Sequence, residues 1–100
     1  MKLEFHPSFK SDLESSALYY LEQGGRALAD QFIDEVERSI FRIVQNPTAS
    51  SAEFRDVRRL RLKRFIAYSI RYCFDEGENT VFIGNLLHGA RHPETEKDRF

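Results

Sequence analysis

Residues 57–64 of the chain are Val-Arg-Arg-Leu-Arg-Leu-Lys-Arg, and their pattern is the strongest indication of the fold. Leu60 and Leu62 alternate with basic residues, which is the period of two that a β-strand imposes on its side chains. The apolar face of this predicted strand must pack on a core, whereas its opposite face is basic. That basic face carries Arg59, Arg61 and Lys63.

Two further strands are predicted downstream. Residues 68–74 place Tyr68, Ile70, Tyr72 and Phe74 on one side and Ser69, Arg71 and Cys73 on the other. Residues 75–79, Asp-Glu-Gly-Glu-Asn, are typical of a hairpin loop. Residues 80–87 are apolar at nearly every position, which predicts a strand inside the sheet rather than at its edge. The second half of the chain therefore predicts a three-stranded antiparallel unit.

The first half of the chain is predicted to form a short strand followed by helices. Leu3 and Phe5 alternate with polar residues, as in a half-buried strand, and Pro7 ends it. Apolar residues then recur at helical spacing over residues 8–23 and again over 26–45. Gly24-Gly25 separates the two stretches, because glycine reaches the left-handed conformation that ends a helix. Residues 48–53 are polar and predict a loop.

These elements predict an α+β fold, with an N-terminal strand and a two-helix antiparallel hairpin packed on a mainly antiparallel β-sheet. One hundred residues leave room for a single core. We therefore expect one domain over residues 1–93 and a polar C-terminal tail over residues 94–100. The order of the strands is left open by the sequence.

The charge is strongly asymmetric. Residues 55–72 hold seven basic side chains and one acidic side chain, a formal charge of +6, whereas the rest of the chain carries −7. This segment predicts a positive surface patch for an acidic partner such as nucleic acid or an acidic peptide.

Other classes of protein are disfavoured by composition. Cys73 is the only cysteine, so an internal disulfide and a zinc site built on paired cysteines are excluded. No His, Asp or Glu cluster has metal-ligand spacing, and we expect no metal or cofactor. The chain shows neither a secretory signal nor a run of apolar residues long enough to span a membrane, and we expect a cytoplasmic protein.

The chain resembles the RelE/ParE superfamily of toxins over residues 2–93, in five places that follow the expected order. These are His6-Pro7 with Leu13, Tyr19-Tyr20, Asn46-Pro47, the basic strand leading through Arg64-Phe65 to Tyr68-x-Ile70-x-Tyr72, and His88-Gly89-Ala90-Arg91-His92-Pro93. The resemblance implies the toxin of a type II toxin–antitoxin pair that arrests growth and is neutralised by a cognate antitoxin in a hetero-oligomer. It further implies one of two targets, DNA gyrase or the mRNA on a translating ribosome.

The chemistry of the two targets differs. Cleaving RNA without a metal requires several acidic or basic groups to converge on one phosphate. RelE-type nucleases carry an arginine directly after the first tyrosine of their Tyr-x-x-x-Tyr strand, where this chain has Ser69, and a tyrosine after the terminal arginine, where this chain has none. Relatives also have Phe-Pro-Tyr where this chain has residues 65–68, Phe-Ile-Ala-Tyr, which indicates a bulge or shifted register.

The incomplete nuclease set favours a ParE-like inhibitor of gyrase. A RelE-like endonuclease and a small, non-toxic nucleic-acid-binding module stay open as alternatives. If the chain is a nuclease, the catalytic candidates are Arg61, Arg71, His88 and Arg91. The candidate residues for binding the target or the antitoxin are Arg58, Arg59, Arg61, Lys63, Arg64 and Arg91.

Overall fold

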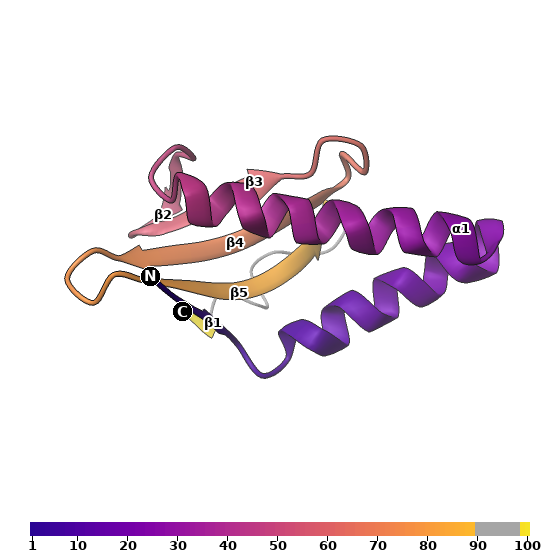
Figure 1. The fold of residues 1–100 in the computed structure, drawn as a ribbon, viewed down its shortest axis with the longest axis horizontal. Helices are drawn as coiled ribbons and strands as arrows, with labels where there is room; N and C mark the ends of the chain where they lie inside the picture. Colours follow the sequence, from indigo (N-terminus) through magenta and orange to yellow (C-terminus); the bar gives the residue numbers. More distant parts are fainter. Residues whose placement is uncertain (90–98) are drawn as a thin grey trace.

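A computed structural model describes residues 1–89 and 99–100 of the chain (Figure 1). The elements are β1 (Lys2–Phe5), α1 (Phe9–Gln45), β2 (Ala52–Phe54), β3 (Val57–Arg61), β4 (Tyr68–Asp75) and β5 (Thr80–His88). Within this described part, the strands form one five-stranded sheet in the order β1-β5-β4-β3-β2. β1 pairs with β5 in parallel, and the other neighbours are antiparallel. The predicted α+β fold, its N-terminal strand and its internal last strand are confirmed.

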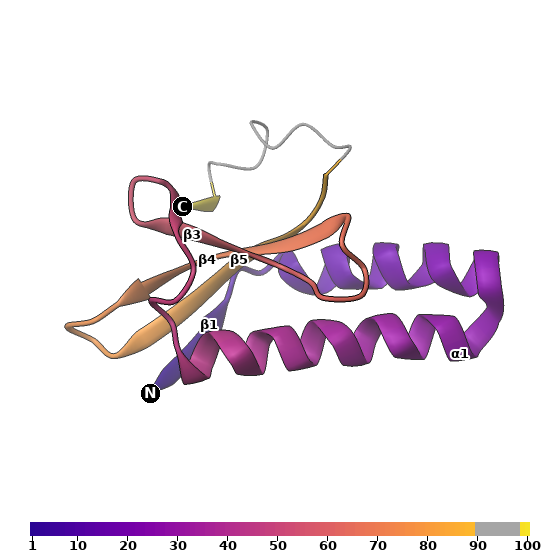
Figure 2. The same ribbon diagram turned by 90° about the horizontal axis from the view of Figure 1, so that it is seen from above.

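The helical segment differs from the prediction of two separate helices. It is one element, α1, whose backbone leaves the helical conformation at Gly25 (φ 83°, ψ −176°). At this residue the element doubles back, so that its first arm (residues 9–24) and second arm (residues 26–45) run beside each other (Figures 1 and 2). Glycine adopts a positive φ without steric cost, and this is why the chain reverses within one residue and needs no loop. No helix in the described part of the chain is both long and apolar enough to span a membrane.

The core lies between α1 and one face of the sheet, which we call the inner face (Figure 2). An aromatic cluster forms one end of it. The ring centroid of Phe32 lies 5.0 Å from Tyr20, 5.1 Å from Phe65 and 4.9 Å from Tyr68. Further buried side chains from both layers complete the core: Phe9, Val36, Ile43, Leu62, Ile70, Tyr72, Val81, Ile83 and Leu86.

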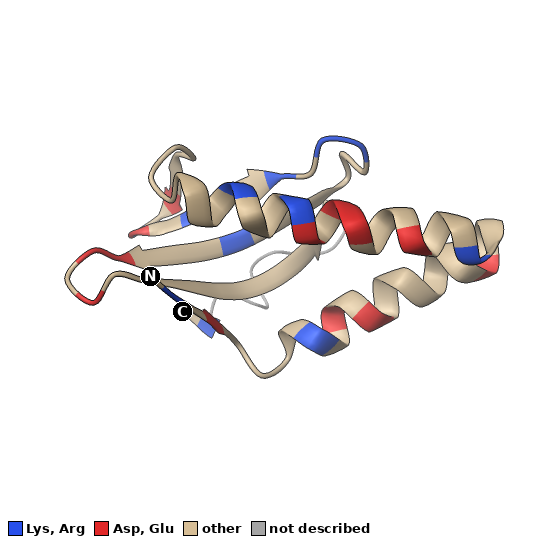
Figure 3. Cartoon of the chain, viewed as in Figure 1, with Lys and Arg blue, Asp and Glu red and all other residues tan. Residues whose placement is uncertain are grey.

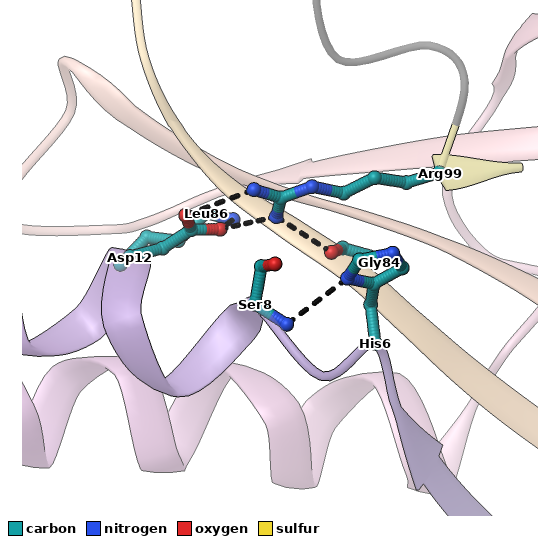
Figure 4. Close-up of polar contacts among 6 residues, drawn as sticks. All are labelled: His6, Ser8, Asp12, Gly84, Leu86 and Arg99. Atoms are coloured by element: carbon teal, nitrogen blue, oxygen red, sulfur yellow. Dashed lines mark hydrogen bonds and ion pairs between the residues drawn. The ribbon is translucent and has the colours of Figure 1, made fainter.

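The opposite face of the sheet, the outer face, is also partly covered. Ser69 and Arg71 of β4 and Asn85 of β5 are all buried, although they are polar. Phe100 packs on this face, because a Cβ atom at Gly84 would lie 2.0 Å from its ring. Arg99 secures this contact by donating to both carboxylate oxygens of Asp12, at 2.5 and 3.1 Å, and to the Gly84 carbonyl at 3.0 Å (Figure 4).

Several element boundaries also differ from expectation. β3 ends at Arg61 rather than at residue 64, and β2 occupies part of the predicted polar loop. β1 is exposed at all four positions rather than half-buried, because it forms an edge of the sheet away from the core. The register shift in β4 lies between Arg71 and Tyr72, opposite Gly84, and not at residues 65–68, of which the first three form a loop and Tyr68 begins β4. Of the predicted tail, only Arg99 and Phe100 lie within the described residues.

Candidate functional site

The basic strand places its arginines on both faces of the sheet. Arg59 pairs with Arg71 across β3 and β4, and Arg61 pairs with Ser69. Directly opposed residues of an antiparallel pair project from the same face, and here it is the outer face. In Figure 3, Lys and Arg positions are marked blue along β3 and on the loop that follows it. Arg61 is exposed and forms no ion pair with any described residue.

Glu53 joins two of these arginines. Its Oε2 lies 2.9 Å from Nη1 of Arg59, and its Oε1 lies 2.7 Å from Nε and 2.5 Å from Nη2 of Arg71. The Arg71 side chain is only 1% exposed, and its guanidinium carbon lies 5.2 Å from the centroid of the Phe54 ring. Arg71 is therefore a buried, paired cation that holds β2 to β4, and it is not open to a substrate.

The Glu53 carboxylate responds to both its burial and its partners. Burial alone would raise the pKa of Glu53, but the hydrogen bonds and positive charges of Arg59 and Arg71 outweigh it and lower the pKa. A carboxyl group whose pKa is lowered by folding stabilises the native state above its unfolded pKa of 4.5. That contribution is lost as the pH falls through the lower, folded pKa.

We expect Glu53→Gln to lower the free energy of unfolding by about 2 kcal/mol at pH 7, because it leaves the buried Arg71 without its carboxylate. The difference from the unmodified protein should shrink as the pH falls below 4.5 and through the lowered pKa of Glu53, where the wild-type carboxylate also becomes protonated. Urea unfolding at a series of pH values measures both effects. The matched control is Glu78→Gln in the exposed β4–β5 turn, which should change stability by less than about 0.5 kcal/mol. A constant difference between the Glu53 variant and wild type from pH 7 to pH 3 would contradict this assignment.

Arg58 does not share the face of Arg59 and Arg61. Its partner in the register is Tyr72, whose side chain belongs to the core between the sheet and α1. Arg58 Nη1 donates to the carbonyl oxygens of Thr48 at 3.1 Å and Ser50 at 2.5 Å. Arg58 therefore holds the loop between α1 and β2 against the sheet.

Lys63 and Arg64 lie beyond the end of β3. Both are exposed, in the loop that joins β3 to β4. The backbone N–H of Lys63 donates to Oε2 of Glu35 on α1 at 3.0 Å, and the N–H of Leu62 donates to the Tyr68 carbonyl at 3.0 Å. The Leu62 bond keeps the register of β3 and β4, whereas the Tyr68 N–H turns to the Phe65 carbonyl at 2.9 Å, so the ladder ends here and the two cations lie in a loop.

Of the nuclease candidates that the structure describes, His88 lies on the opposite face of the sheet from Arg61 and Arg71. His88 is opposite Tyr68 in the register, and its ring lies 5.0 Å from the Tyr68 ring on the inner face. Arg61 and Arg71 project from the outer face, on the other side of the sheet. Arg91 lies outside the described residues. Within residues 1–89 and 99–100, no group of three or more His, Cys, Asp or Glu side chains could hold a metal ion.

The molecule also has a long apolar groove between the two arms of α1. It consists of two adjoining hollows of about 530 and 510 Å³, which share Leu13 and Ile33. Leu18 and Leu21 line one hollow and are 53% and 44% exposed, and Phe5 of β1 lines the other and is 44% exposed. Contiguous exposed apolar surface of this kind marks interaction sites in soluble proteins.

Sequence reasoning missed two acidic residues that organise the basic region. Glu53 fell in a predicted loop, although an acid directly before a basic strand is a sign of a paired hairpin. Glu35 lies among the apolar positions of its helix, three residues after Phe32, and its acidic side chain is only 6% exposed. An acidic residue at an apolar position of an amphipathic helix was the available signal for a buried contact.

The fold and the basic strand define the class of the protein, a toxin of the RelE/ParE superfamily. The family model of the ParE toxin of the type II toxin–antitoxin system parDE matches residues 3–93. The chain belongs to this family, and is a ParE-like toxin. None of the curated protein sequences compared with the chain is significantly similar to it.

Two solved structures share the fold. A chain of the chromosomal ParDE system from P. aeruginosa is 18% identical, with a TM-score of 0.75 over 88% of this chain and 95% of that one. The isolated E. coli RelE toxin is 14% identical, with a TM-score of 0.60 over 97% of this chain and 93% of that one. At these identities the likeness concerns the fold alone.

Proposed function

We propose that this ParE-like toxin inhibits DNA gyrase in the bacterial cytoplasm and that a cognate antitoxin neutralises it. One observation favours gyrase inhibition over RNA cleavage. The structure separates His88 from Arg61 and Arg71 by the thickness of the sheet, and Arg71 is buried in an ion pair. Metal-free cleavage of RNA needs such groups to meet at one phosphate. An inhibitor that acts by binding needs only a surface.

The purified toxin should abolish supercoiling by DNA gyrase and leave mRNA intact in a translating extract. The reason is that the binding surfaces are formed in the free chain, whereas a convergent set of catalytic side chains is absent from the described residues. Gel assays of plasmid supercoiling and mapping of mRNA 5′ ends give the two readouts, and toxin pre-mixed with its antitoxin is the control. Codon-positioned cuts with normal supercoiling would instead establish the RelE-like activity.

The antitoxin, in this proposal, lays an apolar segment into the groove between the two arms of α1. An amphipathic helix fits a groove of this shape and chemistry, because its apolar residues recur on one side at the spacing of helical turns. Leu18 and Leu21 would lose their exposed surface on binding. Such a segment can be disordered in the free antitoxin and fold when it binds the toxin.

A further inference from the structure

We propose that the loop between β3 and β4, residues 62–67, is the element that contacts the target, and that it presents Lys63, Arg64 and Ile66 to an acidic protein surface. We call this segment the presenting loop. The inference rests on the proposed function, since it assigns the residues with which the toxin would bind gyrase. In this proposal the presenting loop binds the target, and the groove between the arms of α1 binds the antitoxin.

The presenting loop is held at both ends and in its middle. Leu62 N–H donates to the Tyr68 carbonyl at 3.0 Å, and Tyr68 N–H donates to the Phe65 carbonyl at 2.9 Å. Gly89 N–H donates to the Ala67 carbonyl at 2.7 Å, which ties the loop to the end of β5. A loop fixed in this way loses little conformational entropy when it binds.

Phe65 and Glu35 anchor the centre of the loop. The Phe65 ring packs 5.1 Å from Phe32 and 5.0 Å from Tyr20, measured between ring centroids. The Glu35 carboxylate, which is nearly buried, accepts the Lys63 N–H at 3.0 Å, and its other oxygen lies 4.0 Å from Arg38. Burying a carboxylate is costly, and a hydrocarbon side chain would pack there at lower cost. The hydrogen bond to the Lys63 N–H accounts for a carboxylate at this buried position, and Glu35 is therefore a positioning residue.

The side chains between these anchors point to solvent. Ile66 is 63% exposed, the highest value among the large hydrophobic side chains that are exposed. Lys63 and Arg64 are exposed as well, and neither forms an ion pair with a residue that the structure describes. Lys63 and Arg64 beside the exposed Ile66 are complementary to a protein surface on which acidic side chains surround an apolar depression. A phosphate backbone would satisfy the cations but would leave Ile66 without a partner.

This surface is distinct from the groove between the arms of α1. The two residues of α1 that hold Phe65, Tyr20 and Phe32, line neither hollow of that groove. No residue of the presenting loop lines it either. Substitutions in the loop can therefore change binding to the target while leaving binding to the antitoxin intact.

The test compares supercoiling inhibition and antitoxin affinity for a set of variants of the full chain. Lys63→Glu/Arg64→Glu and, separately, Ile66→Ser should each raise the toxin concentration for half-inhibition of gyrase at least about tenfold. Glu35→Ala should do the same, whereas Glu35→Gln should stay within about twofold of wild type, because its amide oxygen still accepts the Lys63 N–H. Lys2→Glu/Arg55→Glu has the same charge change at exposed sites outside the loop and should be neutral.

Affinity for the antitoxin should change less than about twofold in every variant, which also shows that each one is folded. Loop variants that inhibit gyrase like wild type, or that lose antitoxin binding in parallel, overturn the proposal. A loss confined to Lys63→Glu/Arg64→Glu, with Ile66→Ser unaffected, overturns the choice of a protein partner in favour of a phosphate backbone.

A separate readout distinguishes failure of the loop assignment from failure of the gyrase proposal. If wild type arrests growth without inhibiting gyrase, the gyrase proposal is wrong, and growth arrest by the same variants then tests the loop. Loss of arrest in the loop variants supports the assignment to another protein target, and full arrest overturns it. A wild-type chain that neither inhibits gyrase nor arrests growth overturns both.

Discussion

Replacing Phe32 with alanine should lower the free energy of unfolding by about 4 kcal/mol, since large-to-small changes at a buried phenylalanine cost about 3 to 5 kcal/mol. Phe32 has no exposed surface and touches Tyr20, Phe65 and Tyr68, so its removal leaves a cavity where α1, the presenting loop and β4 meet. For a domain of 100 residues this corresponds to a fall of about 20 °C in the melting temperature. Thermal and urea unfolding followed by circular dichroism provide the measurement.

Phe41 supplies a control with the same chemistry on the same helix. It is 62% exposed, so Phe41→Ala removes the same atoms without opening a cavity and should cost less than about 0.5 kcal/mol. Equal destabilisation by the two substitutions would show that Phe32 is not in the core. The Phe32 variant should also lose activity against the target before it unfolds, because Phe65 loses half of its aromatic support.

Leu18→Asp/Leu21→Asp should weaken binding of the antitoxin at least about a hundredfold. Both leucines line the groove between the arms of α1 and are about half exposed in the free chain, so folding should tolerate the change. In the complex, each carboxylate would have to enter an apolar contact, and the few central residues that dominate an interface each contribute about 2 kcal/mol or more. Titration calorimetry with the purified antitoxin measures the affinity.

Phe41→Asp again provides the matched comparison, since it places a carboxylate at an exposed apolar position outside the groove. Its affinity for the antitoxin should stay within about twofold of wild type. Growth arrest adds a second readout: the Leu18/Leu21 variant should stay toxic even when the antitoxin is co-expressed. An unchanged affinity in this variant would remove the groove from the antitoxin interface and leave the sheet edges as the alternative.

Local patterns along the chain were enough to establish the class of fold, most elements and the place of the reversal in the helical segment. These features depend on local rules: period-two alternation along β3 and β4, helical spacing of apolar residues, and the freedom of glycine at Gly25. The sequence also located the segment with an excess of basic residues. The family followed from the same residues, because the basic strand and the tyrosines after it are contiguous in the chain.

Which basic side chains a partner can reach depends instead on tertiary packing. Alternation assigns Arg59 and Arg61 to one face, but it cannot say that Glu53 pairs with Arg59 and Arg71, since a hairpin had to bring β2 beside β3 first. It also cannot say that Glu35, 28 positions away in the chain, accepts the Lys63 N–H. Burial and ion pairing depend on contacts between distant residues. A local pattern therefore shows where charge is concentrated, and the packing of α1 and β2 determines which of those charges a partner can reach.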